Sequence, residues 1–330
     1  MPSFSDMNIA VIGTNFISDS FCLAAKKVRG VNVLAVYSRT NDRGRGFAER
    51  HGIPRAFCDL DTMLSDKDID AVYVASPIFV HADQVVRAMR SGKHVLCEKM
   101  MAATLDEFYA MRSASEKYGK VLLEAMRPAH DPLWRAVRES FPKIGKIRRA
   151  SLEFYQYSSR YDKFKAGTVE NAFNPKIKNS ALSDIGIYPL SMALSLFGEP
   201  ESLDSRSVFL ENGFEGEGAL TLGYPDKLVT VTYSKISDGV TPSVIEGEDG
   251  SIIINKVSAP TSVTLKLRGE APQLIAKAAT EENMHHEITS FRDMCEGIRD
   301  HKPYLDVTEL QQKIVDASYK LSGANKFFFA

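Results

Sequence analysis

Cysteine is scarce in this sequence, and no cysteine pair is spaced for a shared site. The 330 residues include four cysteines, none of them in a C-x-x-C motif. Because the cysteines are few and scattered and form no C-x-x-C pair, neither a disulfide scaffold nor a zinc knuckle is expected. The pattern favours reduced thiols and predicts a cytoplasmic protein. The four residues are Cys22, Cys58, Cys97 and Cys295.

A basic excess and long apolar runs are also absent. The formal net charge is −1, whereas proteins that bind a phosphate backbone usually carry a clear excess of lysine and arginine. No stretch reaches the roughly 18 consecutive apolar residues of a membrane span. The first residues, MPSFSDMN, do not combine a basic region with an apolar segment, so no signal peptide is expected. Nucleic acid and membrane partners are therefore not predicted.

The first part of the chain alternates short apolar runs with helical patterns. Strands that are apolar on both faces and are connected by helices form a parallel, doubly wound sheet. Because 330 residues exceed what one core usually covers, we expect two domains and assign residues 1–125 to the first. The apolar runs cover residues 7–12, 31–37, 71–76, 94–98 and 120–125.

The turn after the first strand, VIGTNFIS, matches part of a dinucleotide-binding fingerprint. That fingerprint, G-x-G-x-x-G or A, lets the backbone approach a pyrophosphate at a helix N-terminus. Gly13 keeps the first glycine, while Asn15 and Ser18 replace the other two. Asparagine tolerates a left-handed backbone better than most residues, and serine is small enough for close helix packing. The strand–turn–helix context favours a cofactor loop over the alternative, an ordinary tight turn.

The tip of the second strand, YSRTNDRGR, carries cations where an NAD site needs an acidic residue. In NAD sites a carboxylate about 20 positions past the first glycines accepts the ribose hydroxyls. Ser38, Arg39 and Arg43 lie there instead, and the first acidic residue is Asp42. Because a guanidinium with a neighbouring hydroxyl suits a 2′-phosphate, we predict NADP in preference to NAD. The alternative is that Arg39 is a solvated surface charge.

From about Gly145 the pattern changes to short strands with closely spaced turns. Residues 146–157 and several later segments alternate apolar and polar residues in part. Hairpin-linked strands of this kind form an antiparallel sheet. A helix is expected over residues 181–197, and two amphipathic helices close the chain. We therefore predict a second, α+β domain over residues 126–330 with a mainly antiparallel sheet.

Asp184 and Tyr188 lie four residues apart in the segment SDIGIYPL, so they share one face of the expected helix. Two polar groups on one face of an otherwise apolar helix can form a buried hydrogen-bonded pair. They can also form the wall of a binding site. The spacing alone favours neither interpretation.

Four segments resemble, in order along the chain, signature segments of the Gfo/Idh/MocA oxidoreductases. They are SPIFVHADQV, GKHVLCEKM, LLEAMRPAHDPLW and SDIGIYPL. The tyrosine form of the last motif, D-x-G-x-Y, is similar to the branch that contains glucose–fructose oxidoreductase and the dihydrodiol and xylose dehydrogenases. The resemblance implies a Rossmann domain followed by an open, mainly antiparallel sheet. Such sheets often serve in oligomerisation, so a homodimer or homotetramer through the second domain is expected.

The resemblance also implies which residues carry the chemistry. Lys99 corresponds to the signature lysine, which is expected to contact the substrate oxygen and the nicotinamide ribose. Tyr188 takes the acid/base position, and Asp184 is expected to orient or polarise the substrate. A lysine ammonium would stabilise the alkoxide-like oxygen of a hydride-transfer transition state and would favour the ionised form of a neighbouring tyrosine. The expected cofactor-binding residues are Gly13, Thr14, Asn15, Phe16, Ile17, Ser38, Arg39, Arg43, Ser76, Pro77, His81, Glu98 and Lys99.

Several positions depart from the family pattern. Met100 replaces a proline that follows the signature lysine through a bond that is commonly cis, and Asn15 replaces the glycine nearest to the pyrophosphate. Ile78 replaces a frequent asparagine near the nicotinamide, and Asn179-Ser180 replaces a usual Gly-Gly.

Together these features predict an NAD(P)-dependent oxidoreductase that transfers a hydride between nicotinamide and a hydroxyl or carbonyl carbon of a small-molecule sugar, polyol or diol. The departures support a second hypothesis, a non-catalytic regulatory protein that senses a nucleotide or sugar on the same fold. No metal site is predicted, because the adjacent pair His285-His286 has no carboxylate at a suitable spacing.

Overall fold

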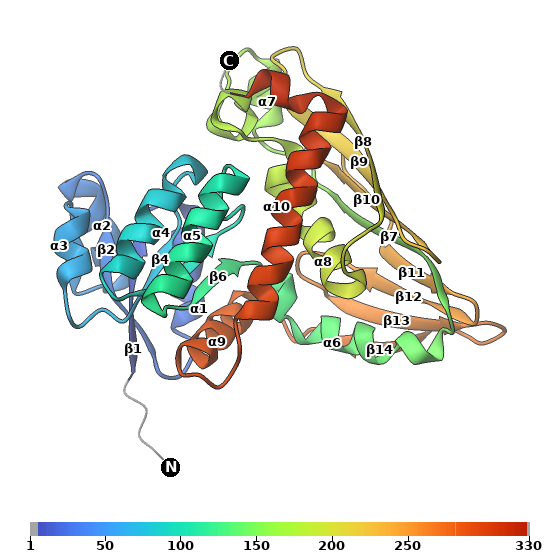
Figure 1. The fold of residues 1–330 in the computed structure, drawn as a ribbon, viewed down its shortest axis with the longest axis horizontal. Helices are drawn as coiled ribbons and strands as arrows, with labels where there is room; N and C mark the ends of the chain where they lie inside the picture. Colours follow the sequence, from blue (N-terminus) through green and yellow to red (C-terminus); the bar gives the residue numbers. More distant parts are fainter. Residues whose placement is uncertain (1–5, 281, 329–330) are drawn as a thin grey trace. The chain divides into compact units, whose positions relative to one another are not determined.

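The structure is a computed structural model that describes residues 6–280 and 282–328 (Figure 1). The chain divides into two compact units. The first unit combines the chain up to Ala125 with Met284–Thr308. The second combines Met126–Asn283 with the chain from Glu309 onward.

The first unit is built on a six-stranded parallel sheet with the order β3-β2-β1-β4-β5-β6. The predicted doubly wound parallel sheet is thus confirmed. Strand β3 was not predicted, because three residues at a sheet edge give no periodic signal. The strands are β1 Met7–Ile12, β2 Val31–Tyr37, β3 Arg55–Phe57, β4 Ala71–Val74, β5 His94–Glu98 and β6 Leu122–Ala125.

Helices cover both faces of this sheet, and β1 contributes to the core on each side. Ile9 and Val11 belong to one buried cluster, whereas Ala10 and Ile12 belong to the other, because successive side chains of a strand point to opposite faces. Helices α1 and α9 pack in the first cluster, and α4 and α5 in the second. The helices between the strands are α1 Phe16–Ala25, α2 Asn41–His51, α3 Leu60–Ser65, α4 His81–Arg90 and α5 Leu105–Tyr118.

Helix α9, Met284–Cys295, belongs to the first unit. The sequence assignment of residues 126–330 to the second domain is therefore wrong for this segment. Ile288 and Phe291 are fully buried in the cluster that holds α1. The apolar stripe of an amphipathic helix is visible in the sequence, but the sequence does not indicate which of the two sheets the stripe covers. Helix α10, Lys302–Ser322, contributes residues to both units.

The second unit contains an eight-stranded sheet with the order β14-β13-β12-β11-β7-β10-β9-β8. It is mainly antiparallel as predicted, and β7 and β10 form its parallel pair. Strand β14 was not predicted. The strands are β7 Ile147–Tyr155, β8 Ser202–Phe209, β9 Glu215–Gly223, β10 Leu228–Ser234, β11 Ser243–Gly247, β12 Gly250–Asn255, β13 Ser262–Leu267 and β14 Gln273–Lys277.

Helix α8, Ile187–Phe197, packs against β7 and β10 on one face of this sheet (Figure 1). The helix predicted over residues 181–197 begins as a π-helical segment, Leu182–Gly186, and ends before Gly198. The other helices of the unit are α6 Pro132–Glu139 and α7 Tyr161–Lys165. In the described part of the chain, no helix combines the length and the apolarity that crossing a bilayer requires.

Candidate functional site

The predicted cofactor residues gather at one edge of the parallel sheet. They follow the carboxyl ends of β1, β2, β4 and β5, which are neighbours in the strand order. Gly13 follows β1 with φ +115°, and a Cβ added there would lie 2.8 Å from the carbonyl oxygen of Ala75. Only glycine fits this left-handed position so close to the backbone that follows β4. The edge is the place where doubly wound sheets bind dinucleotides.

Asn15 caps helix α1 and does not use its tolerance for left-handed backbone. Its backbone is extended, with φ −94° and ψ 179°, so the conformational reason given from the sequence is wrong. The side-chain oxygen accepts the N–H of Ser18 at 3.1 Å, and the amide donates to the carbonyl of Ala75 at 2.8 Å. Asparagine thus replaces glycine as a helix cap. The N-terminus of α1, with Phe16 69% exposed, remains suited to an anion.

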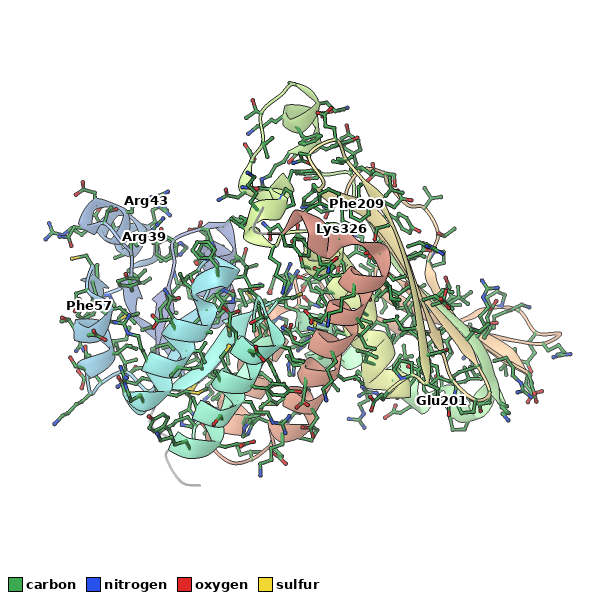
Figure 2. All side chains as sticks on the ribbon, turned by 45° about the horizontal axis from the view of Figure 1, so that its top comes forward. Arg39, Arg43, Phe57, Glu201, Phe209 and Lys326 are labelled. Carbon is green, nitrogen blue, oxygen red and sulfur yellow. The ribbon has the colours of Figure 1, made fainter. Side chains whose placement is uncertain are left out.

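Two guanidinium groups lie where β2 leads into α2. Arg39 follows β2 and Arg43 lies in the first turn of α2; both are exposed, and Figure 2 labels both. Ser38 is buried, and its N–H bonds to the carbonyl of Phe57 at 3.0 Å, which fixes the tip of the strand. These positions agree with a cationic site for the 2′-phosphate of NADP.

The tips of β4 and β5 are connected through a buried histidine. His81 has its Nε2 2.7 Å from the carbonyl oxygen of Ser76 and its Nδ1 3.1 Å from that of Met101. Burial lowers the pKa of His81, so the ring is neutral near pH 7 and donates from one nitrogen. The hydroxyl of Ser76 donates to Gln84 at 2.6 Å, and the adjacent Pro77 is exposed. Since a neutral ring has a single N–H, His81 donates a hydrogen bond to one of the two carbonyl oxygens, that of Ser76 or that of Met101, and its other nitrogen lies beside the second.

The tip of β5 carries Glu98 and Lys99. The Glu98 carboxylate accepts the hydroxyl of Tyr73 at 2.5 Å and the backbone N–H of Lys99 at 3.2 Å. The Lys99–Met100 peptide bond is cis, although proline is replaced. The side chain of Lys99 is partly buried. Glu98 thus supports the backbone from which Lys99 extends.

Glu124 lies at the tip of β6, where the sequence predicts a strand tip, but it is not among the expected cofactor-binding residues. It is buried in β6, and its carboxylate accepts the N–H of Met101 at 2.9 Å and bonds to the hydroxyl of Thr308 at 3.3 Å. The backbone N–H of Met101 is therefore held by Glu124, and the Met101 carbonyl lies beside the His81 ring. A carboxylate within the apolar run VLLEA was the available signal, because a buried charge needs a specific partner.

In the second unit, the D-x-G-x-Y segment rests on β10. A Cβ added to Gly186 would lie 2.6 Å from the ring of Tyr233, and one added to Gly218 would lie 2.3 Å from its hydroxyl oxygen. The Tyr233 hydroxyl bonds to the buried Glu215 at 2.9 Å, and Glu215 also accepts the N–H of Leu182 at 3.1 Å. Burial raises the pKa of Glu215. These contacts fix where the π-helical segment begins.

Asp184 forms an ion pair with Lys235. The Lys235 Nζ lies 2.8 Å from the Asp184 carboxylate and donates to the carbonyl of Ala172 at 2.7 Å. The ammonium also lies 4.7 Å and 5.2 Å from the ring centroids of Phe173 and Phe214. The lysine is 4% exposed, whereas the aspartate side chain is 40% exposed. Sequence reasoning missed Lys235, although a lysine directly after the apolar strand LVTVTYS was a visible signal.

Tyr188 lies one helical turn after Asp184 and contacts Arg127. The guanidinium donates to the Tyr188 hydroxyl at 3.5 Å and lies 5.9 Å from the ring centroid. The ring of Phe154 on β7 lies 5.8 Å away on a tilted plane. Asp184 and Tyr188 thus each have a cation beside them, which favours the binding-site interpretation of their spacing over a purely structural pair.

The first unit therefore contains the expected cofactor residues with Lys99, and the second contains Asp184 and Tyr188 with Lys235 and Arg127. Among the described residues, no group of three or more His, Cys, Asp or Glu side chains could hold a metal ion.

Comparison with protein families identifies both parts of the chain. Residues 7–126 match the model of an oxidoreductase family with an NAD-binding Rossmann fold, and residues 140–253 match the GFO/IDH/MocA C-terminal domain. The parallel sheet with its cofactor edge and the second sheet with its D-x-G-x-Y segment correspond to these two matches.

Curated relatives and solved structures agree with this match. The chain is 39% identical over 285 residues to scyllo-inositol 2-dehydrogenase (NADP(+)) IolU of Bacillus subtilis, which covers 86% of this chain and 87% of the relative. It is 29% identical to trans-1,2-dihydrobenzene-1,2-diol dehydrogenase of Xenopus laevis over 77% of both chains. The fold resembles KijD10, a 3-ketoreductase from Actinomadura kijaniata, with a TM-score of 0.84, 22% identity and coverage of 96% and 98%.

Proposed function

The chain belongs to the Gfo/Idh/MocA family of NAD(P)-dependent oxidoreductases, and on that premise we propose that it interconverts a secondary alcohol and a ketone on a sugar, polyol or diol. The named relatives are dehydrogenases, which supports an enzyme over the regulatory alternative. The observation that carries the proposal is the pairing of Asp184 with Lys235 and of Tyr188 with Arg127 on one segment. Two directed polar groups of this kind suit a polyhydroxylated substrate.

NADP is the preferred cofactor in this proposal. The Gly13 turn and the N-terminus of α1 suit the pyrophosphate, and Arg39 and Arg43 suit the 2′-phosphate. The Bacillus relative is named for NADP(+). The bound nicotinamide would accept a hydride in its oxidised form and donate one in its reduced form.

Three side chains take the catalytic roles in this mechanism. In the reductive direction, the Tyr188 hydroxyl donates its proton to the substrate oxygen as the carbonyl carbon gains a hydride. The Lys99 ammonium stabilises the negative charge that develops on that oxygen, and Arg127 stabilises the phenolate left on Tyr188. Asp184 accepts a hydrogen bond from a neighbouring substrate hydroxyl. The oxidative direction reverses these transfers.

The substrate class most directly supported is a cyclic polyol. The relative with 39% identity is named as a scyllo-inositol dehydrogenase, and a ring with adjacent hydroxyls offers one to the acid/base and its neighbour to the aspartate. Scyllo-inositol is therefore the first substrate to test, followed by other inositols and D-xylose.

The test combines cofactor binding with turnover. NADPH and NADH fluorescence titrations are run on the wild type, and reduction of NADP⁺ is followed at 340 nm with each polyol as the substrate. We expect tighter binding of NADPH, turnover of a polyol, and a loss of kcat of about 10²- to 10⁴-fold in Tyr188→Phe with retained NADPH binding. Tight cofactor binding without turnover of any sugar, polyol or diol would instead support the regulatory protein.

The assembly and location complete the proposal. An open sheet face is usually covered by a partner, so we propose a homodimer or homotetramer formed through the sheet of the second unit. Light scattering that gives a monomer would contradict it. The scattered cysteines are consistent with a cytoplasmic location, where thiols stay reduced.

A further inference from the structure

We propose that Lys235 is a positioning residue that fixes the Asp184 carboxylate for substrate binding. The proposal rests on the proposed function, because it assigns a role to the site that contains Asp184. Lys235 is 4% exposed, so its ammonium acts on substrate through its neighbours. Those neighbours come from three different segments of the second unit.

The first neighbour is Asp184 itself, which belongs to the π-helical segment. The ion pair measures 2.8 Å, within the range of a charge-assisted hydrogen bond. Because the aspartate side chain is 40% exposed while the lysine is buried, the pair presents the carboxylate outward and keeps the cation inside. A carboxylate held in this way keeps one orientation toward a hydroxyl group.

The second neighbour is the backbone of residues 171–173. Lys235 donates to the carbonyl of Ala172 at 2.7 Å. The next residue, Phe173, is fully buried in a small cluster with Phe164 and Phe214, and the ammonium lies near the rings of Phe173 and Phe214. This contact is a cation–π interaction. Lys235 therefore joins the segment before the motif to the aspartate of the motif.

Tyr233, two residues earlier, holds the same π-helical segment. Its ring lies against Gly186, and Lys235 reaches Asp184. Tyr233 and Lys235 are two residues apart, and so are their partners Gly186 and Asp184. Each side chain therefore contacts one end of the D-x-G sequence. Tyr233 fixes the place of the segment, and Lys235 fixes the direction of its carboxylate.

The closing experiment compares Lys235→Met, Lys235→Arg and Asp184→Asn with the matched control Lys227→Met. Lys227 adjoins β10 at its other end and pairs with Asp226 at 2.6 Å. With scyllo-inositol and NADP⁺, we expect Lys235→Met to lose about 30-fold in kcat/KM, mainly through KM, and Lys235→Arg to recover part of it. The control should stay within about twofold, and NADPH affinity should be unchanged in all variants.

The double variant Asp184→Asn/Lys235→Met separates positioning from independent action. If Lys235 acts through Asp184, the double variant loses no more kcat/KM than Asp184→Asn alone, since the two losses share one interaction. Losses that multiply would overturn the proposal. The double variant leaves neither an unpaired Asp184 carboxylate nor an unpaired Lys235 ammonium. If Lys235→Met does not fold, the double variant and Lys235→Arg still test whether Lys235 acts through Asp184.

Hydrogen exchange gives a readout that does not depend on turnover. Amides of residues 171–186 should exchange at least about fivefold faster in Lys235→Met, with no change in peptides of the first unit or in the Lys227→Met control. Unchanged exchange at residues 171–186 would overturn the proposal. If the wild type oxidises no polyol, the proposed function fails, while hydrogen exchange still decides whether Lys235 positions the segment.

Discussion

Gly186 lies against the ring of Tyr233 so closely that an added Cβ would come within 2.6 Å of two ring carbons. Tyr233 is fully buried, and its hydroxyl bonds to Glu215, so the ring has little room to move away. The middle glycine of the D-x-G-x-Y motif is therefore required by packing. The contact between Gly186 and Tyr233 therefore also fixes the positions of Asp184 and Tyr188 in the motif.

We predict that Gly186→Ala destabilises the protein by about 1–3 kcal/mol, because an extra methyl group overpacks a rigid aromatic contact. Polyol turnover should fall with it, since Asp184 and Tyr188 flank the substituted position. Urea denaturation measures the first effect, and kcat measures the second. The matched control is Gly46→Ala in α2, where a Cβ meets nothing within 4 Å. That change should stabilise the helix by about 0.5–1 kcal/mol.

Removing the guanidinium of Arg39 or Arg43 should change the choice of cofactor. Each alanine variant loses charged hydrogen bonds to the 2′-phosphate, so the Kd for NADPH should rise about 10- to 100-fold while the Kd for NADH stays nearly constant. Fluorescence titration with both nucleotides measures this ratio. Arg45→Ala, on the same helix as Arg43 and also exposed, is the control and should leave both affinities unchanged. An equal loss for NADH and NADPH would contradict a 2′-phosphate site.

Glu124 should matter for turnover through Met101. In Glu124→Leu, the buried N–H of Met101 loses its acceptor at 2.9 Å, which costs about 1–3 kcal/mol of stability and shifts the backbone from which Lys99 extends. We expect kcat to fall, with a smaller effect on NADPH affinity. Glu124→Gln keeps an acceptor oxygen and should restore most of kcat. Equal losses in both variants would show that the charge itself is required.

His94 should make stability depend on pH. Burial lowers its folded-state pKa to about 4 from the ordinary 6.5, and the ring Nδ1 accepts the N–H of Val121 at 3.0 Å. Because the unfolded state binds the proton more tightly, this contribution is present above pH 6.5 and is lost as the pH falls toward 4. It amounts to about 2–3 kcal/mol. Urea denaturation of the wild type and of His94→Gln over this pH range should show a smaller pH dependence in the variant.

Much of the first unit could be predicted from the sequence. Apolar runs marked five strands of the parallel sheet, and the structure brings the tips of four of them, with Gly13, Arg39 and Lys99, to one edge. This succeeds because parallel strands are buried on both faces, so each run is continuous. Strands β3 and β14 give no such run, because one has three residues and the other is largely exposed at an edge.

The remaining site features depend on contacts between segments distant in sequence. Lys235 and Asp184 are 51 positions apart, and their pairing follows from how β10 meets the π-helical segment. Glu124 and Met101 likewise meet because β6, which contains Glu124, pairs with β5, which Met101 follows. The same limit explains the wrong assignment of α9, whose apolar stripe was visible although the surface it covers was not. Local sequence patterns identify helices and strands, whereas the contacts between distant side chains can be read only from the folded chain.

The match between Y-x-K at the end of β10 and D-x-G in the facing segment has a consequence for protein engineering. Side chains alternate along extended chain, so one residue inserted between Tyr233 and Lys235 would turn the lysine toward the opposite face. The motif D-x-G-x-Y is therefore not portable by itself. A graft of this half-site onto another sheet would need both segments, with the strand in the correct register, to transfer its chemistry.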